Sequence, residues 1–517
     1  MRIKFVIRNI FANIGGFFLS TLLNFIVRIV FIRTLGIEYL GINALFMNIL
    51  TILSIANLGI GTSIMYSFYK PIAENDTKKI QILLSFFAKV YRVIGLVILL
   101  LGLSLLPFLD NIIKGENDIP HISIIYILFL LNSVISYFYI HKSSIVTAHQ
   151  KNYVIVIINN TFTIIFGILQ ILILLSTKNF ILVLLVQLLI TITQNIYTSK
   201  KAEKMFPYIK QKNSKKIPKS ELSDMIENIK GVVLYRIGSV ITNGTDNIII
   251  SSFLSIGLVG IYSNYLLIIN AVTGLFSRIF SSMSASIGNL AASDSKDKQY
   301  FIYKVLFLIH FWIYGFASIV LIILINPFIK WWLGAEYVLG NSVVLFIVLN
   351  FYLWGMQGVT NNFRVAYGIF KQGKYRPIVA SIINLVVSII LVKHMGISGV
   401  LIGTGVSILA VAFWFDPLIV HKYGLKVSQA PYFIRYFLYT IVVVVAGVIT
   451  KIACSFLGND NLIYIIFKFI ICTLIINVIF YLCFNKTKEF QYLWNIRKKY
   501  LHSIRGKFSR HKANQSS

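Results

Sequence analysis

The segment 231–254 has the length of a membrane-spanning helix and is mostly apolar, yet it carries an arginine, two asparagines and an aspartate. A charge at the centre of a bilayer costs about 2.5–3.5 kcal/mol on insertion scales, so such residues are typical of transport pathways. At about 100° per residue, Arg236, Asn243 and Asn247 share one helical face, and Asp246 lies on its flank. Arginine bonds phosphate through two parallel hydrogen bonds, so this face predicts contact with an anionic, phosphate-bearing ligand.

The first apolar segment, near 10–32, carries a similar set of polar residues. Asn13, Ser20 and Asn24 share one helical face, and Arg28 lies one turn beyond them. We predict that the two polar faces meet across a water-filled cavity. The alternative is a seam of interhelical hydrogen bonds that serves packing alone.

Charged residues also lie inside other apolar segments. Arg92 is near the middle of the segment 82–108, and Lys89 precedes it by one turn on the same face, so this pair is predicted to line a polar cavity. Arg278 and Arg364 lie toward the cytoplasmic ends of their segments, where long basic side chains either line the cavity or snorkel to the surface, as Lys89 also could.

These residues together predict a cation-lined cavity that favours anions. Its predicted substrate-binding residues are Asn24, Arg28, Lys89, Arg92, Arg236, Asn243, Asn247, Arg278 and Arg364. Asp246, read as the one deep carboxylate, either couples transport to H⁺ or Na⁺ or tempers a neighbouring arginine. Lys468, near the outer end of its segment, is expected to snorkel. No catalytic residue, metal site or cofactor is expected.

The composition of the chain identifies the elements that must hold these residues. Of 517 residues, 57% are hydrophobic and 13% are charged. Apolar runs of about 18 residues or more recur along the chain, as in membrane-spanning helices. Helices satisfy their own backbone hydrogen bonds in lipid, so the predicted fold class is an all-α polytopic membrane protein. The net charge of +31 is also typical of nucleic-acid binders, but the placement of the basic residues argues against that class.

Fourteen transmembrane helices are predicted, with both termini in the cytoplasm. The runs lie near 10–32, 39–66, 82–108, 121–147, 154–176, 180–199, 231–254, 257–288, 302–325, 342–369, 378–395, 397–420, 433–457 and 462–484. The predicted outside loops contain few basic residues, namely Arg33, Lys114, Lys178, Lys330 and Lys393. Most of the 48 Lys and Arg fall in the predicted cytoplasmic segments, as the positive-inside rule requires.

An internal repeat divides the chain. LGIEYLGINALFMNIL (35–50) aligns with LSIGLVGIYSNYLLII (254–269), and the same offset places Asn24 opposite Asn243. Both copies begin in the same orientation, which predicts a parallel repeat of two six-helix bundles followed by two further helices. The predicted domains are an N-terminal bundle (1–200), a basic cytoplasmic linker (201–230), a C-terminal bundle (231–420), two additional helices (421–484) and a basic cytoplasmic tail (485–517).

With this layout in place, two segments carry a family resemblance. TDNIIISSFLSIGLVGIYSNYLLI (245–268) and, less specifically, GISGVLIGT (396–404) resemble the polysaccharide-transporter branch of the MOP exporter superfamily, which includes Wzx-type flippases. The resemblance implies a protein of the bacterial cytoplasmic membrane that moves an undecaprenyl-diphosphate-linked oligosaccharide, for capsule, O-antigen or exopolysaccharide, by alternating access. It implies as partners the lipid-linked substrate, membrane lipids, and polysaccharide polymerase and chain-length machinery, with no nucleic acid.

Alternatives to this function remain open at the level of sequence. A lipid II or teichoic-acid-precursor flippase is one alternative, and lipid II flippases share the fourteen-helix layout and cationic cavity. A multidrug exporter of the same superfamily is a further candidate, although the cationic cavity argues against it. A membrane transferase would need acidic catalytic residues on sizeable loops, and the outside loops are too short for these, so no enzymatic activity is expected.

Overall fold

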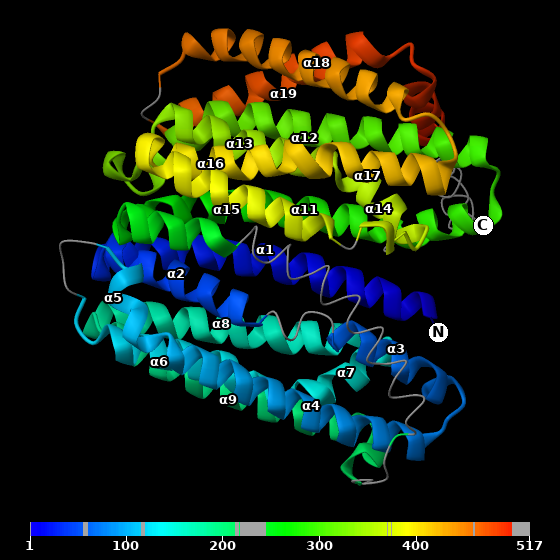
Figure 1. Ribbon diagram of the computed structural model, residues 1–517. Helices are drawn as coiled ribbons and strands as arrows, with labels where there is room; N and C mark the ends of the chain where they lie inside the picture. The colour runs from blue at the N-terminus through cyan, green and yellow to red at the C-terminus, as the bar shows by residue number, and fades with distance from the viewer. Residues whose placement is uncertain are drawn as a thin grey trace, which may run out of the picture. The chain divides into compact units, whose positions relative to one another are not determined.

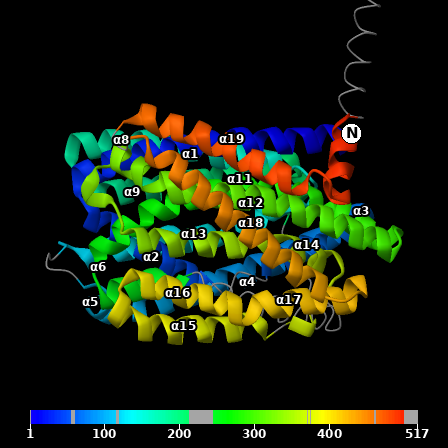
Figure 2. The ribbon, with the colours of Figure 1, turned by 90° about the horizontal axis from the view of Figure 1, so that it is seen from above.

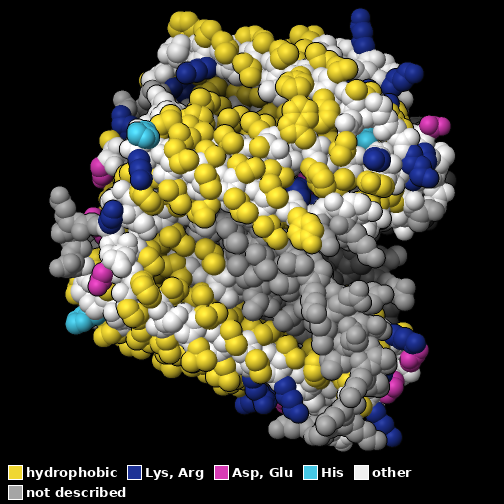
Figure 3. Space-filling model, viewed as in Figure 1, with side chains coloured by type: hydrophobic (Ala, Val, Ile, Leu, Met, Phe, Trp, Pro, Cys, Tyr) yellow, Lys and Arg dark blue, Asp and Glu magenta, His cyan; other side chains and the backbone are white. Residues whose placement is uncertain are grey.

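The computed structural model describes residues 2–54, 60–114, 119–211, 217, 244–369, 371–373, 375–458 and 461–498, and every regular element within these ranges is a helix (Figure 1). Apolar side chains cover most of the described surface in Figure 3, and lysine and arginine side chains gather toward its edges. This distribution is the one that a lipid environment requires of a helical protein.

Most of the predicted membrane segments are present as long apolar helices. In the described part of the chain, eleven helices are long and apolar enough to cross a membrane. A further pair, α6 (Ile122–Tyr137) and α7 (Ile140–Ala148), is bent by 46° and makes a twelfth if it is one span. The chain is therefore an all-helical, multi-pass membrane protein.

Two predicted segments, 39–66 and 231–254, include residues outside the described ranges. Their described parts are α2 (Ile37–Leu53), α3 (Ile60–Ala73) and the helical residues 244–253. The count of fourteen helices and the cytoplasmic placement of both termini therefore stay predictions.

The remaining α-helices complete the sequence of elements. They are α1 (Arg2–Leu35), α4 (Thr77–Ser104), α5 (Leu109–Ile112), α8 (Asn152–Thr177), α9 (Phe180–Met205), α11 (Ile256–Ser293), α12 (Lys296–Trp332), α13 (Asn341–Met356), α14 (Gly358–Ala366), α15 (Arg376–Met395), α16 (Ile397–Ser407), α17 (Phe413–Ile419), α18 (Ala430–Ser455) and α19 (Leu462–Phe484). Two π-helical turns flank α17: Ile408–Ala412 joins it to α16, Val420–Leu425 follows it, and together they form the single candidate span Ile397–Leu425.

The helices form two compact units. Unit 1 comprises Met1–Arg278 and Lys374–Thr404, and unit 2 comprises Ile279–Gly373 and Gly405–Ser517. Within unit 1, α1 packs along α8, α6 packs on α9, and α4 packs on α6. Unit 1 thus combines the N-terminal helices with the first part of α11 and with α15 and α16. The domain boundaries predicted from the sequence follow the order along the chain and stay a prediction.

Within unit 2, α12 is the helix about which the others pack. It contacts α13, α18 and α19, and Figures 1 and 2 both show α18 and α19 beside it. Aromatic rings fill the seam, with the Phe311 ring 4.4 Å from that of Tyr439 and 4.7 Å from that of Phe480. Aromatic pairs of this kind add about 0.5–1.5 kcal/mol each beyond the burial of their area. The last two helices are therefore an integral part of unit 2.

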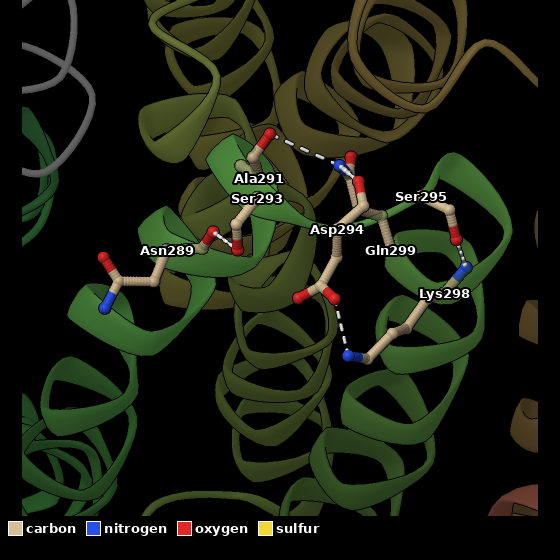
Figure 4. Close-up of polar contacts among 7 residues, drawn as sticks. All are labelled: Asn289, Ala291, Ser293, Asp294, Ser295, Lys298 and Gln299. Atoms are coloured by element: carbon tan, nitrogen blue, oxygen red, sulfur yellow. Dashed lines mark hydrogen bonds and ion pairs between the residues drawn. The ribbon is translucent and has the colours of Figure 1, made fainter.

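The turn between α11 and α12 is closed by local polar contacts (Figure 4). The Lys298 backbone N–H donates to the Ser295 hydroxyl at 3.5 Å, and the Lys298 ammonium pairs with Asp294 at 2.5 Å. The buried Gln299 amide donates to the Asp294 carbonyl at 2.7 Å. A serine N-cap is worth about 1 kcal/mol, so these residues end one long helix and start the next within a short polar turn.

A second polar cluster fixes the chain just after α19. Residues 488–498 are helical, and the Glu489 carboxylate accepts a hydrogen bond from Arg435 at 2.9 Å and lies 3.8 Å from the Lys304 ammonium. Burial alone would raise the pKa of Glu489, but these two cations and the local backbone hold that pKa below its ordinary value of 4.5. The cluster ties α12, α18 and the segment after α19 together at one end of unit 2.

Candidate functional site

Arg28 is the predicted site residue with the clearest capacity to bind an anion. It lies on α1, is half-buried, and donates a hydrogen bond from Nη1 to the Ser263 hydroxyl of α11 at 2.9 Å. Within the described part of unit 1 its guanidinium makes no ion pair with a carboxylate. A half-buried arginine with one neutral partner keeps most of its five donors and its full charge for a ligand.

Arg278 lies on the same pair of helices. Its guanidinium stacks on the Phe17 ring of α1 at 3.8 Å, and its Nη1 donates to the Gly274 carbonyl at 2.8 Å. The close approach of Gly274 leaves room for the ring, since a Cβ there would lie 3.0 Å from the Phe17 ring edge. A cation over an aromatic face gains about 0.5–2 kcal/mol, so Arg278 is held against α1 rather than extended freely.

The two arginines mark different depths along one seam. Arg28 meets α11 near its start, whereas Phe17 meets α11 near Arg278, so α1 and this part of α11 run antiparallel. Ser263 and Arg278 are separated by about 22 Å along the helix axis at 1.5 Å per residue. One diphosphate group is too small to touch both arginines at once, and the seam therefore offers two separate cationic positions.

Asp246 lies at one end of a hydrogen-bonded cluster of four polar side chains. The Thr245 hydroxyl donates to the Asn384 carbonyl oxygen at 3.3 Å, and the Asn384 amide donates to the Thr404 hydroxyl at 2.9 Å. The Thr404 hydroxyl in turn lies 3.3 Å and 3.4 Å from the two Asp246 carboxylate oxygens. Carboxylate, hydroxyl and amide oxygens are ligands that hard cations prefer. The cluster brings together three segments of unit 1, namely residues 244–253, α15 and α16.

Asn384 and Thr404 were not predicted as site residues. Asn384 is fully buried on α15, and Thr404 lies on α16 at the end of the segment 396–404. Each is a polar residue inside an apolar run, which was the only signal available. Among the described residues, the hydrogen-bond partner of Asp246 is Thr404, and no lysine or arginine pairs with the carboxylate.

Arg364 does not occupy a position open to a ligand. Its side chain is 2% exposed, pairs with the Asp416 carboxylate at 3.2 Å, and donates to Asn361 at 2.8 Å. The prediction that Arg364 lines a cavity therefore conflicts with its burial in an ion pair between α14 and α17. Asp416 is a second carboxylate within the apolar segments, buried against Arg364 near the predicted cytoplasmic end of the segment 397–420.

The other predicted residues fall into three groups. Asn24 on α1 and Lys89 and Arg92 on α4 are exposed, and neither cation of α4 makes an ion pair with a described residue. Asn247 is 3% exposed, and its side-chain oxygen lacks a hydrogen-bond partner among the described residues. Arg236 and Asn243 lie outside the described residues. Whether the exposed residues bind substrate stays a prediction.

Lys468 differs from its predicted position. Instead of snorkelling, its side chain is buried on α19, where the residue is 4% exposed. The neighbouring Cys454 of α18 lies with its sulfur 3.9 Å from the Lys468 carbonyl oxygen, inside the contact between α18 and α19. The lysine therefore belongs to the packing of the last two helices.

Solved structures with the same fold are membrane transporters. A structure of the lipid II flippase MurJ, in an inward closed conformation, is 14% identical with a TM-score of 0.66, covering 92% of this chain and 98% of that chain. An inward-facing multidrug resistance MATE family transporter of the MOP superfamily is 15% identical with a TM-score of 0.63, covering 81% and 99%. A point mutant of the Vibrio cholerae MATE transporter VcmN is 14% identical with a TM-score of 0.54, covering 82% and 97%. At these identities the likeness shows the fold.

A family model identifies the relationship in sequence. The model described as polysaccharide biosynthesis protein (Polysacc_synt) matches residues 6–286, which is more than half of the chain and includes the segment 245–268. No curated protein sequence matches the chain at a significant level. The resemblance drawn from the sequence is thereby confirmed. The chain belongs to the polysaccharide biosynthesis protein family, and its fold is that of the MurJ and MATE transporters of the MOP superfamily.

Proposed function

We propose that the protein is a flippase that moves an undecaprenyl-diphosphate-linked oligosaccharide repeat unit from the cytoplasmic to the outer leaflet of the bacterial cytoplasmic membrane. Family membership supports a role in polysaccharide biosynthesis, and the likeness to MurJ and MATE structures supports transport rather than enzymatic chemistry. The polymer served is capsule, O-antigen or exopolysaccharide, and the polymerase and chain-length machinery are proposed partners.

The observation that carries this proposal is the half-buried Arg28 on the α1–α11 seam, which pairs with no carboxylate of the described residues. The part of the substrate common to all lipid-linked repeat units is an anionic diphosphate, and arginine recognises phosphate oxygens in a bidentate manner. Arg278, about 22 Å away along α11, offers a second cationic position for the same group at another depth. Two such positions suit a headgroup that moves from one side of the membrane to the other.

The polar cluster that ends at Asp246 is the proposed coupling site. Asp246 was expected either to couple transport to H⁺ or Na⁺ or to temper an arginine, and its described contact is with the Thr404 hydroxyl. Among the described residues, the groups near the carboxylate are neutral oxygens, which suit a proton or a sodium ion. We therefore assign the coupling role to Asp246, with Thr404 and Asn384 as supporting ligands.

The test is a sidedness assay in proteoliposomes that contain a fluorescent undecaprenyl-diphosphate oligosaccharide, with outer-leaflet substrate removed by a membrane-impermeant enzyme. A charge-assisted hydrogen bond is worth about 1.5–3 kcal/mol, so Arg28→Ala should slow flipping by about 10- to 100-fold. Arg28→Lys should retain part of the rate, because lysine keeps the positive charge but lacks the planar guanidinium that donates two parallel hydrogen bonds. Arg33→Ala, on an exposed residue of the same helix, is the matched control.

The same assay separates the proposal from its alternatives. A lipid II or teichoic-acid-precursor flippase would move those substrates faster than the oligosaccharide. A multidrug exporter would confer drug sensitivity on deletion and would leave lipid-linked substrates unmoved. Equal flipping rates in Arg28→Ala and Arg33→Ala proteins would remove Arg28 from the binding site.

A further inference from the structure

The first turns of α2 and α11 cross each other at two glycines. A Cβ added to Gly41 of α2 would overlap the backbone carbonyl oxygen of Ile256, and a Cβ added to Gly260 of α11 would overlap the carbonyl oxygen of Ile37. That second Cβ would also lie 3.2 Å from the Gly41 backbone nitrogen. The two helices thus meet backbone against backbone, in the way that small residues allow between membrane helices.

The contact is reciprocal, because the two copies of the internal repeat present the same aligned positions to each other. The alignment that pairs segment 35–50 with segment 254–269 places Ile37 opposite Ile256 and Gly41 opposite Gly260. Exchanging the two copies converts the Gly41–Ile256 contact into the Gly260–Ile37 contact. In a parallel repeat the two helices run in the same direction. A pseudo-two-fold axis along that direction would pass between the two glycines, so this crossing lies where the two repeats meet.

A second set of backbone contacts lies beside the crossing. The Lys114 N–H donates to the Ser251 carbonyl at 3.3 Å, and the Ile256 N–H donates to the Lys114 carbonyl at 2.9 Å. The Ser251 hydroxyl also donates to the Ile112 carbonyl at 2.6 Å. These hydrogen bonds therefore fix the loop after α5 to the turn before α11. Ile256, whose carbonyl faces Gly41, takes part in one of them.

The polar residues of the α1–α11 seam begin directly below this crossing. Ser263, which bonds Arg28, and Asn264 follow Gly260 by about one helical turn. Asn264 is fully buried, and neither of its amide atoms has a hydrogen-bond partner among the described residues. An unpaired buried amide costs about 1–3 kcal/mol, and water or a ligand would satisfy it if the crossing opened.

We propose that Gly41 and Gly260 form the outer gate of the transport path, a reciprocal glycine contact that closes above Arg28 and must separate before a headgroup leaves. This inference rests on the proposed function and on the positive-inside assignment of these helix ends to the outside. The backbone hydrogen bonds of Lys114 with Ser251 and Ile256 form the second half of the gate. Glycine is required because any side chain at either position holds the two helices apart.

The test measures opening directly, with a cysteine reporter in a background whose native cysteines are replaced by serine. Asn264→Cys places the reporter below the crossing, and its reaction with a membrane-impermeant maleimide from outside reports access. Overpacking typically costs about 1–3 kcal/mol, so Gly41→Val and Gly260→Val should each raise the labelling rate about tenfold or more. Gly257→Ala is the matched control, because a Cβ there makes only ordinary contacts of 3.8–4.0 Å.

A crosslink provides the opposite perturbation. A Cβ at position 257 would lie 3.8 Å from Ile37 Cγ2, so side chains at positions 37 and 257 are in contact and the pair Ile37→Cys and Gly257→Cys is the crosslink to test. Oxidation of this pair should close the gate, abolish reporter labelling, and stop transport until a reductant is added. Each single cysteine variant under the same oxidant is the control.

The outcomes separate the gate from the substrate. Raised labelling in both valine variants, with Gly257→Ala unchanged and all proteins folded by size-exclusion chromatography, supports the gate even if the oligosaccharide is not the cargo. Labelling at the control rate in both folded valine variants would overturn it. If a valine variant fails to fold, the crosslink decides: oxidised protein that still labels and transports at the reduced rate would overturn the gate.

Discussion

The buried pair of Arg364 and Asp416 gives a prediction whose size follows from its burial. The two side chains are 2% and 4% exposed and lie 3.2 Å apart, with Asn361 bonding the same guanidinium at 2.8 Å. Removing one member of a buried pair typically costs about 3–5 kcal/mol, because the other charge is left without a partner or water. Arg364→Ala and Asp416→Ala should therefore each destabilise unit 2 by that amount.

A variant that replaces both members of the pair distinguishes a structural role of Arg364 from a role in transport. Replacing a buried pair with apolar residues of similar volume is often neutral, so Arg364→Met with Asp416→Leu should recover to within about 1 kcal/mol of the wild-type stability. The assay is unfolding of the purified protein in mixed detergent–SDS micelles, with flipping measured on the same samples. If Arg364→Ala kept wild-type stability and lost flipping, the arginine would be a ligand-binding residue and the structural reading would be refuted.

Three further predictions concern the coupling site, the end of unit 2 and the cavity. Asp246→Asn should abolish the dependence of flipping on pH or Na⁺ gradients while leaving substrate binding intact, and unchanged gradient dependence in vesicles would remove Asp246 from coupling. The pKa of Glu489 is lowered in the folded protein, so its stabilising contribution is complete above the unfolded-state value of 4.5 and is lost as pH falls through the lower folded value. Glu489→Gln should therefore lower the thermal midpoint at neutral pH and weaken its fall on acidification, and parallel curves for variant and wild type would contradict this. Arg92→Ala and Arg236→Ala should each slow flipping, with the exposed Lys451→Ala as control, and equal mild effects in all three would mean that the charges only anchor helices.

The apolar runs were predictable from the sequence because lipid imposes a simple constraint on length and polarity. The segments near 154–176 and 462–484 match α8 and α19, and the segment near 302–325 lies inside the longer α12, since no tertiary contact is needed to define an apolar run. The bend between α6 and α7 and the π-helical turns beside α17 were not predicted. Such irregularities depend on how neighbouring helices re-satisfy the backbone, which a hydropathy pattern does not contain.

The partners of charged residues were the less predictable part. The prediction for Arg364 used only its position within the apolar segment. Its role depends on Asp416, which lies 52 residues away and on another helix. Asp416 sits inside the predicted run 397–420, and a carboxylate in such a run was the available signal for an ion pair. For Asp246 the depth in the segment was enough to identify the residue, but its link to Thr404 and, through Thr404, to Asn384 depended on the fold.

The central claim is that the protein carries a lipid-linked, diphosphate-bearing oligosaccharide across the membrane. The most direct measurement is the leaflet distribution of undecaprenyl-diphosphate repeat units in cells that lack the protein, read by an impermeant glycan-modifying enzyme added outside. We predict that the units accumulate on the cytoplasmic leaflet and that wild-type protein, but not Arg28→Ala, restores their outward movement. Normal outer-leaflet exposure and normal surface polysaccharide in the deletion would contradict the account.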